Sequence, residues 1–168
     1  IKGISETDEW TKPILDHPEF VKNRHEIVSY CIDSGINYVD ACNANEILAY
    51  SKALKGRRDK MYFGWSWVEN EPRSPHWRTA EKLMQGLDEG LTWASLRGVD
   101  YVDVWRISAI VDSGDHTFHE SEEIVAALDK AKRQGKARFT GVSSHDRGWL
   151  KMMIDEFPEQ MDVILLPY

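Results

Sequence analysis

The chain contains only two cysteines, Cys31 and Cys42, which are too few for a disulfide framework and fit no metal-binding spacing. It also lacks any run near the roughly 18 uninterrupted apolar residues that a membrane span requires. Its first residues, IKGISETDEW, show neither the charged nor the apolar region of a signal peptide. We therefore expect a soluble protein without membrane contact, in a reducing compartment that is by default the cytoplasm.

Basic runs are also scarce. The chain has 28 acidic and 21 basic residues, a formal net charge of −7, and one short basic cluster at residues 55–60 that is typical of a solvated helix end. This balance argues against a nucleic-acid partner. We expect a small-molecule carbonyl compound or another polar ligand instead, and the sequence does not indicate an oligomeric state.

What the sequence does contain is a regular alternation of helical and strand patterns. With 42% apolar residues, a chain of this length can form a single domain, residues 1–168, with a sizeable core. The predicted helices are 18–34, 43–55, 75–97, 121–134 and 146–157, and the predicted strands are 36–40, 61–66, 101–107, 136–143 and 162–166. Apolar strands that alternate with helices favour βαβ units and a parallel sheet.

A parallel sheet of this kind forms either a barrel or an open, doubly wound sheet. An open sheet that binds dinucleotides would carry G-x-G-x-x-G after its first strand, and this chain has no such motif. The pattern therefore favours a (β/α) barrel, in which functional residues lie on the loops after the strands.

Five segments of the chain resemble the aldo/keto reductase family, in the family's order and spacing. They are GINYVDAC, ALKGRRDKMYFGWS, GVDYVDVWRIS, ALDKAKRQGKARFTGVSSH and MDVILLPY. The resemblance implies an α/β fold, a (β/α)8 TIM barrel of which this chain supplies strands 2 to 6 with the intervening helices. Such a barrel takes roughly 250 residues, so we expect the native polypeptide to be longer.

The resemblance also implies NADP(H) binding and carbonyl reduction by a tetrad of Asp, Tyr, Lys and His, in which Tyr donates the proton. Asp40 matches the tetrad Asp, whereas Asn45, Ser66 and Ser108 stand at the Tyr, Lys and His positions. Asparagine has no useful acidity, and neither serine replaces a lysine cation or an imidazole. The tetrad is therefore degenerate.

The cofactor positions are partly retained. In the family, a Ser-Asn pair and a Gln contact the nicotinamide carboxamide, and Ser143, Ser144 and Leu165 stand at these positions. The resemblance thus implies that NADP(H) is bound with fewer contacts to its nicotinamide carboxamide than in the family. Three functions stay open: an oxidoreductase with a degenerate tetrad, a non-catalytic ligand-binding or scaffold protein, and a cofactor-free lyase or isomerase that uses Asp40 or His145.

Strand alternation suggests a replacement for the missing lysine. If Ser108 faces the barrel axis, Arg106 does so too, and a buried guanidinium requires an anion. We therefore predict that Arg106 is the counter-ion of Asp40. The pair either serves stability alone or shapes a pocket for a polar or anionic ligand.

Other residues near strand ends have two readings each. His145 either donates a proton to a ligand or, with Asp146, caps the next helix. Trp65 and Trp67 either stack on a ligand or lie half-buried at the rim. Cys42 is either a nucleophile or a small buried hydrophobic residue, and we expect the second because no base lies near it in the sequence.

The segment VDSGDHTFHE has residues whose spacing could hold a metal: Asp112, Asp115, His116 and His119. The segment contains glycine and precedes a helix, which favours a solvated loop. We therefore expect no metal site.

Overall fold

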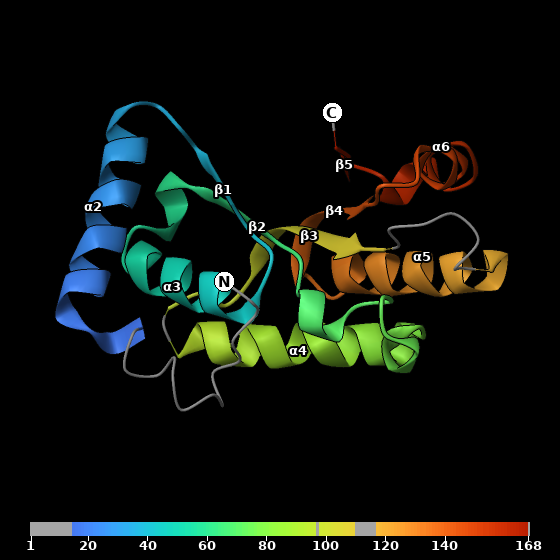
Figure 1. The fold of residues 1–168 in the computed structure, drawn as a ribbon, viewed down its shortest axis with the longest axis horizontal. Coiled ribbons are helices and arrows are strands. Elements are labelled where there is room, and N and C mark those ends of the chain that lie inside the picture. Colours follow the sequence, from blue (N-terminus) through green and yellow to red (C-terminus); the bar gives the residue numbers. More distant parts are fainter. Residues whose placement is uncertain (1–14, 97, 110–116, 168) are drawn as a thin grey trace.

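The computed structural model describes residues 15–96, 98–109 and 117–167. Five parallel strands form one sheet in chain order: β1 (Tyr38–Ala41), β2 (Tyr62–Trp65), β3 (Val102–Ser108), β4 (Ala137–Ser143) and β5 (Val163–Leu165). The sheet curls into a half-barrel with helices around it (Figure 1). The predicted α/β fold, part of a (β/α)8 barrel, is confirmed.

The helices alternate with the strands as the sequence predicts. They are α2 (Pro18–Asp33), α3 (Ala44–Leu54), α4 (Ala80–Ser95), α5 (Phe118–Arg133) and α6 (Arg147–Glu156). Neighbouring helices pack on each other, α2 on α3, α3 on α4, and α4 on α5, and Figure 1 shows α4 and α5 side by side. Among the helices that the structure describes, none combines the length and apolar character needed to cross a membrane.

Helix starts differ from the predicted ones where a capping residue decides the boundary. The helix expected from Pro75 begins at Ala80, because the Thr79 side chain accepts a hydrogen bond from the Lys82 backbone N–H and Pro75–Trp77 form a separate 3-10 turn. The helix expected from Ser121 begins at Phe118, since Thr117 and Glu120 form a capping box.

Strand β2 separates two environments. Phe63 and Trp65 are fully buried in the core between sheet and helices, where their rings meet edge to face at 5.4 Å. The alternating residues Gly64 and Ser66 lie on the opposite face, toward the barrel axis. This face carries the polar side chains described below.

Candidate functional site

A pocket of about 520 Å³ lies at the carboxyl ends of the strands, the end at which barrel enzymes carry function. All five strands or the loops after them contribute to its wall. The lining residues are Asp40, Cys42, Ser66, Val68, Arg73, Arg106, Ser108, Ala109, Ser143, Ser144, His145, Leu165, Leu166 and Pro167. These described lining residues include two arginines and one acidic residue, so the part of the wall that they form is positive on balance.

An ion pair joins the first and third strands within this wall. Arg106 Nη2 donates to Asp40 Oδ2 at 2.7 Å, and the Arg106 side chain is 4% exposed against 35% for Asp40. Strand β2 lies between these two strands, and its Gly64 pairs with Asp40 in the sheet register. The hydrogen bond that strand alternation predicts is therefore present.

A chain of hydrogen bonds continues from Arg106 to the other arginine. Arg106 Nη1 donates to Ser143 Oγ at 2.8 Å, and Ser143 Oγ lies 2.8 Å from Ser108 Oγ. Arg73 Nη2 donates to Ser108 Oγ at 3.2 Å. Two guanidinium groups are thus held by two neighbouring hydroxyls.

Tyr38 is a partner of Asp40 that the sequence reading missed. Its hydroxyl donates to Asp40 Oδ1 at 3.0 Å, and its ring occupies the space over Gly64, where a Cβ would lie 2.2 Å from the Tyr38 hydroxyl. Burial raises the pKa of Tyr38 above its ordinary value, and the Asp40 carboxylate raises it further. This tyrosine therefore retains its proton and is not poised as an acid.

Glu71 is the second missed residue. It is 2% exposed, and its Oε1 accepts a hydrogen bond from the Ser108 backbone N–H at 3.0 Å, while Oε2 is buried without a partner. Burial raises the pKa of Glu71 to about 8, although Ser108, Arg73 and Arg106 oppose the shift. The carboxyl group is therefore mostly protonated at neutral pH and contributes little negative charge beside the pocket.

Seven of the nine predicted site residues line the pocket. They are Asp40, Ser66, Arg106, Ser108, Ser143, Ser144 and His145. The Ser66 hydroxyl is buried without a hydrogen-bond partner, whereas His145 is exposed at the wall. The structure brings these side chains together, and their catalytic, pocket and cofactor roles stay predictions.

Two predicted pocket residues are misplaced. Trp65 is fully buried in the helix-facing core, because it alternates with Gly64 and Ser66 along β2. Asn45 lies in the first turn of α3 and does not line the pocket, and its Oδ1 is buried without a partner. Helix α3 begins so soon after β1, capped by Asn43, that Asn45 is carried away from the strand end.

Three other expectations are resolved by the structure. Asp146 caps α6 by accepting hydrogen bonds from the backbone N–H groups of Gly148 and Trp149. Trp67 is buried in the core and packs on Trp93, so it is not a rim residue. Cys42 is exposed at the pocket instead of buried, and partial burial and then Glu46 raise the pKa of its thiol, which disfavours the nucleophilic thiolate.

The segment considered for a metal is described only at one end. Asp112, Asp115 and His116 lie outside the described residues. His119 is exposed on α5, where its ring nitrogens lie 3.5 Å from Glu122 and 3.8 Å from Glu123. Within the described ranges, the structure groups no three His, Cys, Asp or Glu side chains as metal ligands.

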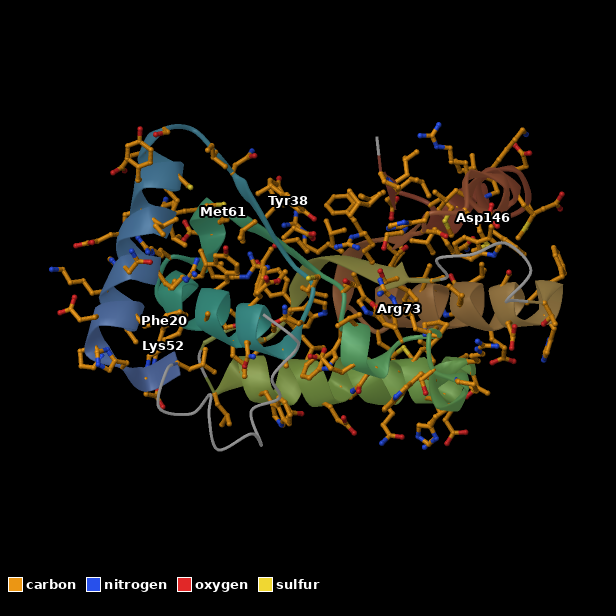
Figure 2. All side chains as sticks on the ribbon, viewed as in Figure 1. Phe20, Tyr38, Lys52, Met61, Arg73 and Asp146 are labelled. Carbon is orange, nitrogen blue, oxygen red and sulfur yellow. The ribbon has the colours of Figure 1, made fainter. Side chains whose placement is uncertain are left out.

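Arg73 is the third site residue that the sequence does not predict, for the same reason as Glu71. Both lie in the loop that follows β2, and a loop has no periodicity that assigns side chains to a face. Tyr38 did have a signal, because it is two positions before Asp40 on one strand. Figure 2 labels Tyr38, Arg73 and Asp146, which come from β1, this loop and the start of α6.

The comparisons with known proteins agree with this architecture. A family model described as "Aldo/keto reductase family" matches residues 21–163. No curated protein matches the chain.

Solved structures give the same result. An aldo/keto reductase from Klebsiella pneumoniae in complex with NADP and acetate is 18% identical, with a TM-score of 0.71, over 91% of this chain and 50% of that one. A Bacillus halodurans aldo-keto reductase in its holo form is 20% identical, with a TM-score of 0.66, over 88% of this chain and 47% of that one. These likenesses support the fold, and the chain spans about half the length of the solved structures that it matches.

Proposed function

The chain belongs to the aldo/keto reductase family, and from this premise we propose that it is an NADP(H)-dependent oxidoreductase with a degenerate tetrad that acts on a small carbonyl compound. The observation that carries the proposal is the pocket at the strand ends, where Asp40 is held by Arg106. Arg106 supplies to Asp40 the positive charge that the family's lysine would supply. Asn45, Ser66 and Ser108 stand at the other tetrad positions.

The pocket has features that fit the nicotinamide end of the cofactor. The Ser66 hydroxyl is buried and unpartnered, so it favours a polar group of the substrate bound next to the nicotinamide. Ser143 and Ser144 line the same pocket and would hold the carboxamide. When bound, NADP(H) supplies the hydride. Two of the similar structures are described as complexes with NADPH and with NADP and acetate, which supports a nicotinamide cofactor.

The chain's own residues would then orient the substrate and provide the proton. Arg106 and Asp40 fix each other, and the Ser66 and Ser108 hydroxyls would orient the substrate by hydrogen bonds to its polar group. The Tyr38 hydroxyl is already engaged as a hydrogen-bond donor to Asp40. We therefore assign His145, which lines the pocket and is exposed to solvent, as the proton donor, because a protonated imidazole ring can donate a proton to a carbonyl oxygen.

The test is NADPH binding to the longest native form of the protein, followed by fluorescence and calorimetry, with turnover of small aldehydes measured on the same sample. We expect micromolar binding and slow NADPH oxidation. His145→Gln should retain binding and lose turnover, with the exposed His119→Gln as the matched control. An absence of NADPH binding at millimolar concentration would contradict the oxidoreductase assignment.

A second function, a non-catalytic ligand-binding or scaffold protein, has one observation in its favour. Both carboxylate oxygens of Asp40 are engaged, Oδ1 by Tyr38 and Oδ2 by Arg106, as in a structural ion pair. Ligand binding without turnover, unchanged in His145→Gln, would favour this function over the first.

A further inference from the structure

We propose that the pocket binds a carboxylate group of the substrate, held by Arg73 together with the hydroxyls of Ser66 and Ser108. The substrate class is then a short organic acid that also carries the reacting carbonyl group. The assignment of this anion to a substrate rests on the proposed function, whereas the binding of the anion does not.

The described residues of the pocket wall include more positive than negative side chains. The Arg106 charge is matched by Asp40, the one acidic side chain in the pocket wall. Arg73 forms no ion pair within the described part of the chain, and its hydrogen bond is to a neutral hydroxyl, Ser108 Oγ. Glu71, the nearest buried carboxyl group to Ser108, is largely protonated at neutral pH. Among the described residues, the positive charge of Arg73 is therefore uncompensated at the pocket.

The Ser66, Ser108 and Ser143 hydroxyls of the pocket wall include protons that no described residue accepts. Ser108 Oγ accepts from Arg73 and Ser143 Oγ accepts from Arg106, and one hydroxyl proton makes the bond between the two serines. The other proton of the pair stays available to a ligand. Ser66 Oγ is buried, lines the pocket and has no partner at all. The wall thus presents more donors than acceptors.

Together, an unpaired cation and surplus donors favour an oxyanion over a neutral ligand, because hydrogen bonds to a charged acceptor are stronger. The guanidinium of Arg73 matches a planar carboxylate, which can accept two of its N–H groups. Leu165, Leu166 and Pro167 form an apolar wall in the same pocket, which suits a short carbon chain attached to the carboxylate. Inorganic phosphate shares the anionic chemistry but has no apolar part for this wall.

The affinity should be modest and dependent on salt. Arg73 is an exposed residue, so water and dissolved ions screen its charge. The buried Ser66 and Ser108 hydroxyls are less accessible to water and should confer the orientation of the ligand. Binding is therefore expected to weaken as the ionic strength rises.

The experiment is calorimetric titration of the longest native form, without cofactor and at low salt, with butanoate, its neutral isostere butanamide, and inorganic phosphate. We expect butanoate to bind at least about 10-fold more tightly than butanamide, since a hydrogen bond to a charged group contributes roughly 1.5–3 kcal/mol. Phosphate should bind more weakly than butanoate. Equal binding of butanoate and butanamide, or tighter binding of phosphate, would overturn the carboxylate assignment.

Two variants locate the binding to these residues. Arg73→Gln should weaken butanoate binding about 10-fold, and Ser66→Ala should weaken it less. The control is Arg133→Gln, because Arg133 is exposed on α5 and pairs with Asp129 away from the pocket. Unchanged binding by Arg73→Gln would overturn the proposal.

Measurement of NADPH binding on the same samples separates this inference from the proposed function. NADPH binding without butanoate binding contradicts the anion site alone. Butanoate binding without NADPH binding supports the anion site and contradicts the oxidoreductase function.

Discussion

Arg106 on β3 donates to Asp40 on β1 at 2.7 Å, although the two residues are 66 positions apart and β2 lies between their strands. Adjacent strands are about 4.8 Å apart, so the side chain bridges roughly 10 Å of sheet. Such a span requires a long side chain on one strand and small residues on the strand between. Gly64 on β2 pairs with Asp40 in the sheet register and has no side chain, and the Tyr38 hydroxyl that binds Asp40 lies over it.

Asp40→Asn should destabilise the protein by about 1–3 kcal/mol, because it leaves the buried Arg106 guanidinium without an anion. The estimate is below that for a fully buried pair, since the Asp40 side chain is 35% exposed and water screens it. Arg106→Met should cost less, as it leaves only the partly exposed Asp40, which keeps its hydrogen bond from Tyr38. Urea unfolding of both variants and the double variant measures the coupling. Strictly additive losses would show that the pair does not act as a unit.

Glu71→Gln should change how stability depends on pH. Burial raises the pKa of Glu71 from an ordinary 4.5 to about 8. Between these values the folded protein holds a proton that the unfolded chain has released, so the wild type loses stability as pH rises, by up to about 1.4 kcal/mol per pH unit. The favourable contribution is complete below pH 4.5 and lost above pH 8.

The measurement is urea unfolding of wild type and Glu71→Gln at pH 5, 6, 7 and 8. The variant has no titrating group at this position, so the stability difference should move steadily in its favour as pH rises. The exposed Glu122→Gln serves as the matched control. Parallel stability curves for wild type and Glu71→Gln would contradict the raised pKa.

The alternation of side chains along the strands predicts much of this site, and it also explains why the prediction for Trp65 is wrong. The same alternation that places Arg106 beside Ser108 on β3 places Trp65 opposite Gly64 and Ser66 on β2. Alternation along β2 therefore indicates that the Trp65 side chain belongs to the core. Helix boundaries deviated because side-chain caps such as Thr79 and Thr117 override the apolar pattern.

Glu71 and Arg73 could not be placed from sequence. They lie in a loop whose path depends on contacts with a strand that follows much later in the chain, at Ser108. No local pattern in VENEPRS indicates which carboxyl group becomes buried. The charge balance of the pocket, on which the anion inference depends, is therefore a property of tertiary structure alone.

Gly141→Ala should disrupt the pairing of β4 with β5. A Cβ at Gly141 would lie 1.8 Å from the backbone oxygen of Val163, so the strands must separate. Overpacking of this kind costs about 1–3 kcal/mol. The shift should also move Leu165 and weaken ligand binding at the pocket.

The control is Gly148→Ala on α6, where the nearest atom to an added Cβ is a side-chain oxygen of Asp146 at 3.2 Å. We expect little loss there, because alanine is favoured over glycine in a helix by about 1 kcal/mol. Thermal unfolding and butanoate titration compare the two variants. Equal stability of both would contradict the proposed clash.

Asp103→Asn should be among the most destabilising single changes at the opposite end of the barrel. The Asp103 side chain is 1% exposed and accepts hydrogen bonds from Arg58, from Arg138 at 2.8 Å and from the Phe63 backbone N–H at 2.8 Å. Asparagine can still accept from Phe63 but loses the attraction to both arginines. The partly buried Arg58 is then left without an anion, so we expect a loss of about 3–5 kcal/mol in urea unfolding.

Arg138→Gln is the informative comparison. Arg138 is half exposed, and Asp103 keeps its ion pair with Arg58 when the Arg138 guanidinium is removed. Its loss should be clearly smaller than that of Asp103→Asn. Asp103 lies near the start of β3, whereas Ser108 at the pocket ends that strand, so folded Asp103→Asn protein should bind butanoate as wild type does. Equal losses in the free energy of unfolding from both substitutions would show that Arg138, and not Arg58, is the arginine that stabilises the Asp103 carboxylate.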